Sequence, residues 1–185
     1  MAINRNNPTP KPFKSYEGLT LEGIAAQIAH SILVWKTYRL STRNDCQLVV
    51  NSLIRSYHTR LATRSRNPLP SSKKAVAERK RGNKPIVEHA IPVACVMKHL
   101  LKRTVKGNFA DVRALIPKVM KVLDESALRA WVAKSEHDAL RNLGLEICMP
   151  EGHKHPWPDR WARYRIAKIV LDTLLQRCRP ASLFS

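Results

Sequence analysis

Residues 21–38 read LEGIAAQIAHSILVWKTY, and this stretch decides the fold class. Its apolar side chains recur at steps of three and four residues, which is the spacing of one face of an α-helix. Thr20 precedes the stretch and can cap its first turn, so the pattern predicts a helix that runs to about Tyr38. The apolar face consists of Leu21, Ile24, Ala25, Ile28, Ile32 and Trp35.

A second stretch of the same kind follows after a short polar interval. Residues 46–61, CQLVVNSLIRSYHTRL, repeat the helical spacing, and Thr42 or Asn44 can cap this second helix. Two amphipathic helices joined by a short turn favour an antiparallel pair, so we expect residues 17–63 to form a helical hairpin. Residues 1–16 contain three closely spaced prolines and are expected to form an extended basic arm.

The helical spacing disappears over residues 64–84, RSRNPLPSSKKAVAERKRGNK. Two prolines, a serine pair and a glycine interrupt this segment, so residues 64–85 are expected to form an extended basic linker or loop. Between Arg55 and Lys84 the only acidic residue is Glu78, against ten basic residues. The ten are Arg55, Arg60, Arg64, Arg66, Lys73, Lys74, Arg79, Lys80, Arg81 and Lys84.

Residues 86–185 return to helical patterns and are expected to pack with the hairpin as one domain. The chain enters this part extended and turns helical near Ile91, because a proline at position 92 is tolerated in the first turn of a helix. Another helix covers residues 109–123, and Pro117 is expected to kink or split it.

The remaining elements are shorter. Residues 128–133 predict a short strand, and a helix that starts near Ser135 ends near Gly144. A final amphipathic helix runs from Asp159 and stops before Pro180. The sequence therefore predicts a mainly α fold of about five to six helices with a possible minor strand pair.

Charge is the strongest compositional feature of the chain. Its 185 residues include 33 Lys and Arg against 14 Asp and Glu, which gives a formal net charge of +19. An apolar fraction of 44% is too high for a disordered basic tail, so the chain is expected to fold. A field of this sign attracts polyanions, and nucleic acid is the partner that we expect first.

Several classes of protein are disfavoured by what the sequence lacks. No stretch approaches the roughly 20 apolar residues of a membrane span, so we expect a cytoplasmic protein without a membrane partner. The sequence has no Gly-rich phosphate loop and no G-x-S-x-G, and no cofactor is expected. The four cysteines form no C-x-x-C pair, which indicates reduced thiols rather than a zinc site: Cys46, Cys95, Cys148 and Cys178.

Two groups of residues are candidates for binding nucleic acid. The first group could neutralise phosphates, although it is also typical of a solvated linker. The second group interleaves aromatic and basic residues that could stack an unpaired base, although the aromatic rings could equally anchor the last helix in the core. The first group is Arg55, Arg64, Arg66, Lys73, Lys74, Arg79, Lys80, Arg81 and Lys84, and the second is Arg160, Trp161 and Arg163.

Residues 88–92, EHAIP, form a candidate catalytic site. An imidazole at the entry to a helix tends to be neutral and can accept a proton from water. E-H-x-x-P resembles the first half of the HNH nuclease motif, which implies His89 as general base and a divalent metal bound by Glu88 and a later histidine. In that family an Asn and a second His follow on a short ββα unit, and the matching downstream residues here are Asn142 and His153.

Two further histidine arrangements stay open. The structural alternative to the catalytic one is a helix-start motif with a partly buried His89. A metal-independent ribonuclease would use His89 with a nearby Arg or Lys. His153 and His155 alternate on a proline-rich loop, and they would form a metal or acid-base site only if the fold brought them to other groups: His137, Glu136 and Asp138.

Three functions follow from these patterns. The first is a non-enzymatic nucleic-acid-binding protein, regulatory or accessory, in which phosphate contacts dominate and DNA is not distinguished from RNA. The second is a nuclease centred on Glu88 and His89, with a divalent metal only in its HNH-like form. The third is an inhibitor or assembly factor that docks to an acidic protein or ribonucleoprotein, a role typical of small basic proteins from phages or mobile elements. The sequence does not decide the oligomeric state.

Overall fold

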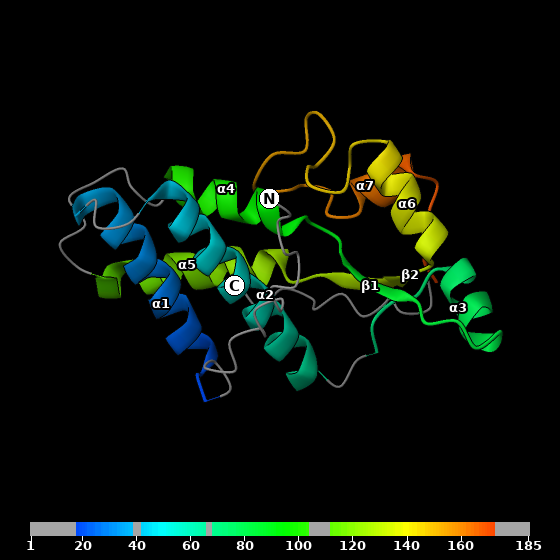
Figure 1. The fold of residues 1–185 in the computed structure, drawn as a ribbon, viewed down its shortest axis with the longest axis horizontal. Coiled ribbons are helices and arrows are strands. Elements are labelled where there is room, and N and C mark those ends of the chain that lie inside the picture. Colours follow the sequence, from blue (N-terminus) through cyan, green and yellow to red (C-terminus); the bar gives the residue numbers. More distant parts are fainter. Residues whose placement is uncertain (1–17, 39–41, 66–67, 104–111, 173–185) are drawn as a thin grey trace, which may run out of the picture.

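The computed structural model describes residues 18–38, 42–65, 68–103 and 112–172 (Figure 1). Most of these residues are helical, and the described part contains one two-stranded sheet, so the prediction of a mainly α fold with a minor strand pair is confirmed. The elements are α1 (Leu21–Leu33), a short π-helix (Val34–Tyr38), α2 (Arg43–Arg64), α3 (Lys73–Lys80), β1 (Ile86–His89), α4 (Val93–Arg103), α5 (Val112–Ser126), β2 (Arg129–Val132), α6 (Lys134–Asn142) and α7 (Ala162–Ile166).

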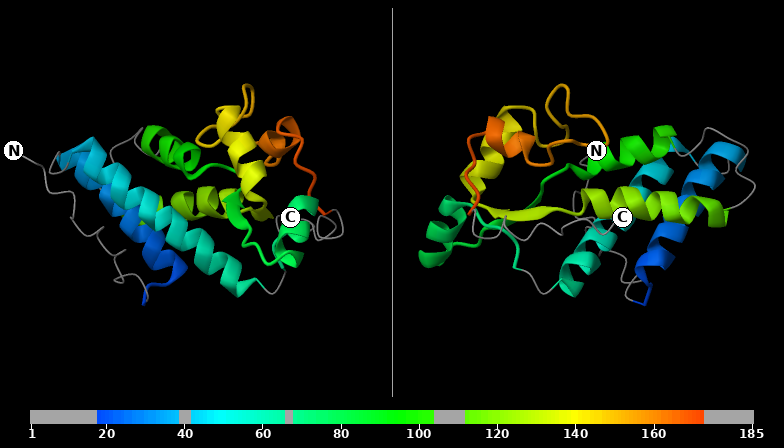
Figure 2. Two further views of the ribbon diagram at one scale, coloured as in Figure 1. Left: turned by 45° about the vertical axis from the view of Figure 1, so that its right-hand side comes forward. Right: turned by 180° about the vertical axis from the view of Figure 1, so that it is seen from behind.

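Four helices, α1, α2, α4 and α5, form what we call the helical bundle. α1 and α2 pack side by side, α5 packs on α1, and α4 packs on α2 (Figure 2). Their predicted caps are confirmed: the Thr20 hydroxyl accepts the Gly23 N–H at 3.0 Å, and Thr42 forms a reciprocal capping box with Asp45. The bundle core is largely apolar, although it also buries His58 and Ser126, which lie 3.1 Å apart. Its fully buried apolar members include Ile24, Ile28, Ile32, Val50, Leu53, Ile54, Leu115, Val119 and Leu123.

Pro117 does not split α5, which runs without a break from Val112 to Ser126. The proline ring is exposed. A proline on the solvent side of a helix removes one hydrogen bond at a place where water can serve the freed carbonyl. Pro117 was expected to kink or split this helix, and the split was wrong.

The other elements, α3, β1, β2, α6 and α7, form what we call the sheet region. β1 and β2 pair antiparallel, with Glu88 opposite Ala130 and His89 opposite Arg129. The sheet extends away from the bundle, with α3 at its far end and α6 and α7 on one side (Figure 1). A second, smaller apolar cluster holds this region together: Ala130, Val132, Leu140, Leu145, Tyr164, Ile169 and Leu171.

Two predicted elements differ from the structure. The segment 64–85, expected to be extended, contains the eight-residue helix α3, which buries Ala75 alone and so lacks an apolar stripe that periodicity could detect. The last helix is short because Lys168 adopts a left-handed conformation with φ 55°, and the Ile169 N–H bonds back to the Tyr164 carbonyl at 2.8 Å. Lysine is not a usual stop signal for a helix, so no local pattern indicates this end.

Some predictions fall outside the described residues. These are the arm at 1–16, Arg66, and the last predicted helix beyond residue 172. Within the described ranges, none of the helices combines the length and apolar character needed to cross a bilayer.

Candidate nucleic-acid interface

Helix α3 is fixed to the sheet by the residues that precede it. The Ser72 N–H donates to the Trp131 carbonyl at 2.8 Å, and the Trp131 N–H donates to the Pro70 carbonyl at 2.8 Å. The Ser72 hydroxyl accepts the Ala75 N–H at 2.9 Å, which caps α3, and donates to the buried Glu136 carboxylate. These bonds fix the orientation of α3 and of the charged side chains that it carries.

The basic side chains of α3 and of the C-terminal part of α2 are exposed to solvent. In Figure 1, α2 ends at the lower edge of the helical bundle and α3 lies at the far end of the sheet, so the two segments are set apart. Eight of the nine residues predicted to bind phosphates are described, and the structure leaves all eight accessible. We call this set the cationic surface: Arg55, Arg64, Lys73, Lys74, Arg79, Lys80, Arg81 and Lys84.

Carboxylates do not neutralise the cationic surface. Glu78 is the only acidic residue in this part of the sequence, and its carboxylate accepts the Asn83 amide at 2.7 Å. Among the described residues, no member of the cationic surface forms an ion pair; the pairs observed lie on α5, β1, α6, α7 and the loop before α7. The positive charges therefore face solvent uncompensated, and phosphates could approach them.

An aromatic ring lies beside this surface. The Arg79 guanidinium sits 5.1 Å from the centroid of the half-buried Trp131 ring. The basic segment itself contains no aromatic residue, so the sequence did not indicate this contact. β2 places Trp131 next to α3, although the two residues are 52 positions apart.

The second predicted group, in the last helix, is not assembled as a binding surface. Arg163 is fully buried, and its guanidinium donates to Glu88 at 2.6 Å and to the Leu145 carbonyl at 2.6 Å. Trp161 packs against Tyr164 with ring centroids 5.5 Å apart. Arg163, a candidate for contact with nucleic acid, instead faces the sheet and joins α7 to β1.

Glu88 and His89 are adjacent on β1, and their side chains take different partners on the two sides of the strand. Glu88 accepts from Arg163 and lies 2.8 Å from Nδ1 of His137 in the first turn of α6. His89 lies instead beside His58 of α2, with ring centroids 5.2 Å apart. Successive side chains of a strand point to opposite faces, so the two predicted catalytic residues do not converge on one point.

His89, the buried His58 and the half-buried Arg129 form what we call the seam, and the exposed Arg55 adds its charge to it. Burial, together with the charges of Arg129 and Arg55, lowers the pKa of His58 to about 4. Burial, His58 and the same arginines lower the pKa of His89 to about 3. Both rings are therefore neutral at pH 7, which is the protonation state required of a base. Among the residues that the structure describes, His58 Nδ1, His89 Nε2 and Arg129 Nε find no hydrogen-bond partner.

The remaining histidines do not join the Glu88 site. His153 lies 3.9 Å from Asp159, and His155 pairs with Glu125 at 3.2 Å while its ring stacks on His99 at 3.7 Å. Within the described ranges, no three His, Cys, Asp or Glu side chains are grouped so that they could hold a metal ion. The histidine that meets Glu88 is His137, not His153, and the exposed Asn142 is not among the partners of Glu88.

The structure adds residues that the sequence did not suggest. His58 and Arg129 complete the surroundings of His89, and Trp131 contacts the cationic surface. His58 looked like one more member of an amphipathic helix, and Arg129 like the first residue of a strand. Only pairing between segments that are distant in sequence brings them together, so no local signal could have identified them.

Comparison of the chain with protein families, with curated proteins and with solved structures found no match.

Proposed function

We propose that this protein binds nucleic acid through the cationic surface. The observation that carries the proposal is the exposure of eight cationic side chains from two chain segments, none of which pairs with a carboxylate in the described part of the chain. Lys and Arg bind phosphates as charges and hydrogen-bond donors, and they release condensed counterions on binding. The expected mode is contact with the phosphate backbone, which positions a strand without reading its sequence.

The anchoring of α3 supports this mode. A free linker would lose conformational entropy on binding, whereas α3 is already held by Ser72 and its contacts to Trp131 and Glu136. Arg79 is likewise restrained over Trp131. A surface whose charges are already positioned binds with less loss of entropy than a disordered basic tail of equal charge.

The test is a binding titration with labelled single- and double-stranded RNA and DNA from about 50 to 300 mM salt. If six of the eight cations contact duplex phosphates, the plot of log affinity against log salt has a slope near −5. Absence of binding to all four nucleic acids at the lowest salt would overturn the proposal, and would favour docking to an acidic protein surface instead.

One observation favours a nuclease as the second candidate. β1, β2 and α6 form a strand–strand–helix arrangement in which Glu88 and His137 meet at 2.8 Å, although α4 and α5 separate the two strands in sequence. A carboxylate and a helix histidine are residue types that hold a divalent metal in nucleases of the type that this sequence resembles. Arg163 engages the same carboxylate, so a metal would have to compete with it.

The same nucleic acids, incubated with and without Mg²⁺ or Mn²⁺, test this candidate. Metal-dependent breaks that vanish in His137→Gln, with binding affinity retained, would support a nuclease. Intact strands under all of these conditions would exclude it and leave binding alone.

A further inference from the structure

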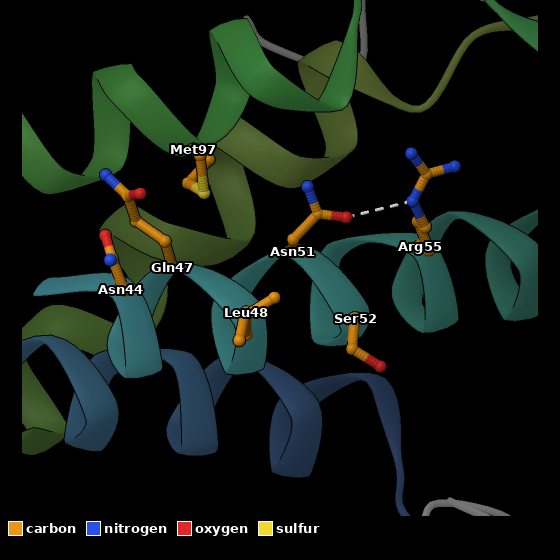
Figure 3. A pocket seen from close by; sticks show the side chains of 7 residues that line it. All are labelled: Asn44, Gln47, Leu48, Asn51, Ser52, Arg55 and Met97. Carbon is orange, nitrogen blue, oxygen red and sulfur yellow. Dashed lines mark hydrogen bonds between the residues drawn. The ribbon is translucent and has the colours of Figure 1, made fainter. Parts of the chain in front are cut away.

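An open groove of about 590 Å³ runs along α2 on the side that faces α4 (Figure 3). Asn44, Gln47 and Asn51 rise from α2 toward α4, and Met97 of α4 borders the groove from the other side (Figure 3). Arg55 closes the row and donates from Nε to the Asn51 side-chain oxygen at 2.9 Å. We call this feature the amide groove.

The polar side chains of the amide groove are largely unused by the protein. In the described part of the chain, the carboxamides of Asn44 and Gln47 have no hydrogen-bond partner, and Asn51 bonds only to Arg55. Three carboxamides one turn or less apart offer both donors and acceptors along one helix face. Leu48, which also lines the groove, is 72% exposed. None of the described residues that line the groove carries a carboxylate, so these residues do not repel an anionic ligand.

Arg55 is the cationic residue that lines the groove. Its side chain is exposed, and Nε is engaged by Asn51. The other guanidinium nitrogen atoms of Arg55 can therefore bind an anion at the end of the row of carboxamides.

We propose that the amide groove is a nucleotide-binding site, in which Asn44, Gln47 and Asn51 hydrogen-bond a base while Arg55 holds its phosphate. Carboxamides complement base edges, which carry donors and acceptors side by side, and guanidinium groups bind phosphate oxygens in pairs. The volume suits an unpaired base with its sugar. The inference rests on the proposed function: the cationic surface holds the strand, and the groove distinguishes its bases.

The experiment uses the full chain, labelled with ¹⁵N, and the four ribonucleoside 5′-monophosphates as probes, with inorganic phosphate and the free nucleosides as comparisons. We expect nucleotides to shift the side-chain amide signals of the groove and the Nε–H signal of Arg55, with affinities that differ among the four bases. Phosphate alone should shift Arg55, together with the Asn51 carboxamide bonded to it, and leave the carboxamides of Asn44 and Gln47 unchanged.

Three variants sharpen the test. Arg55→Met should weaken all four nucleotides by about fivefold or more, because a charged contact is lost. Asn51→Ala should reduce the differences among the bases and leave the affinity for phosphate unchanged. Lys74→Met, on the cationic surface, is the matched control and should leave nucleotide binding as it was.

Other results would overturn the inference. These are shifts that map outside the groove, shifts of the Asn44 and Gln47 carboxamides by phosphate alone, or no shift with any nucleotide at about 20 mM, well above the millimolar range expected of a weak site. If these occur while polymers still bind in a salt-dependent way, the groove assignment fails and the proposed function stands. Binding of nucleotides without any binding of polymers would support the groove assignment and overturn the proposed function.

Discussion

The helical bundle and the sheet region are held together by different forces. The bundle buries a continuous apolar core between four helices, and its caps lie at exposed ends. The sheet region has a smaller apolar cluster and relies on buried polar groups: Arg163 with Glu88, and Ser72 with Glu136. An apolar core tolerates substitutions of similar volume, whereas removal of one partner of a buried ion pair leaves the other charge uncompensated. The basic helix α3 belongs to the sheet region and is held by buried polar contacts.

The largest expected effect comes from removing the buried guanidinium of the sheet region. Arg163→Met leaves Glu88 without its cation and the Leu145 carbonyl without its donor, so unfolding free energy should fall by about 3–5 kcal/mol in denaturant titrations. The matched control is Arg165→Met, which removes an exposed arginine paired with Asp159 and should change stability by less than about 1 kcal/mol. Equal losses of unfolding free energy in the two variants would show that the burial of Arg163 does not add to its contribution to stability.

Acid should destabilise the seam between the two regions. His58 and His89 have folded-state pKa values of about 4 and about 3, below the value of an exposed histidine, so the unfolded chain binds more protons as the pH falls below about 6.5. Stability is fully present above that pH, and each ring should remove about 2 kcal/mol by pH 5.

A histidine variant separates the loss of stability caused by protonation of His89 from the loss caused by protonation of carboxylates at acid pH. His89→Gln should lose about 2 kcal/mol less than the parent between pH 7.5 and pH 5 in chemical denaturation. Parallel pH profiles for the two proteins would mean that His89 is not buried in its neutral form.

A moderate effect is expected at the start of α3. Ser72→Ala removes the cap of α3 and the hydroxyl that donates to buried Glu136, so we expect a loss of about 1–2 kcal/mol. Ser135→Ala, at an exposed position in α6, should change stability by less than about 0.5 kcal/mol. Hydrogen exchange should also accelerate at the α3 amides in Ser72→Ala alone, and unchanged exchange there would contradict the anchoring role of Ser72.

The smallest effect tests a cap of the helical bundle. Thr42→Ala breaks the capping box with Asp45 at the exposed start of α2 and should lower unfolding free energy by about 1 kcal/mol. Thermal unfolding measures it, with Thr63→Ala near the end of the same helix as the control. A loss of unfolding free energy as large as that of Arg163→Met would contradict the proposed difference in how the two regions are stabilised.

The helical bundle was predictable because its information is local. Ile24, Ile28 and Ile32 recur at the helical period, and Thr20 and Thr42 stand where caps are needed. The strand at 128–133 and the extended entry at 86–89 were also indicated by local pattern. Packing of apolar faces then follows from the need to bury them.

The sheet region was less predictable because its buried groups are polar. Arg163 looked like a solvent-facing arginine, and its burial depends on Glu88, 75 positions earlier in the chain. α3 lacks an apolar stripe because it is held by Ser72 and Glu136 rather than by packing. The exposure of the basic residues could be expected from their charge. The amide groove could not be predicted, because it depends on how α4 packs against α2.

The salt dependence of nucleic-acid binding tests the central claim most directly, when measured for two triple variants of equal charge. Lys74→Gln, Lys80→Gln and Arg81→Gln together remove three charges from the cationic surface, and the control removes three exposed lysines elsewhere: Lys102, Lys121 and Lys154. The account predicts that the log–log slope falls by about 3 in the first variant and stays unchanged in the control. Equal reductions in both variants would mean that net charge alone attracts the polyanion and that no particular surface receives it.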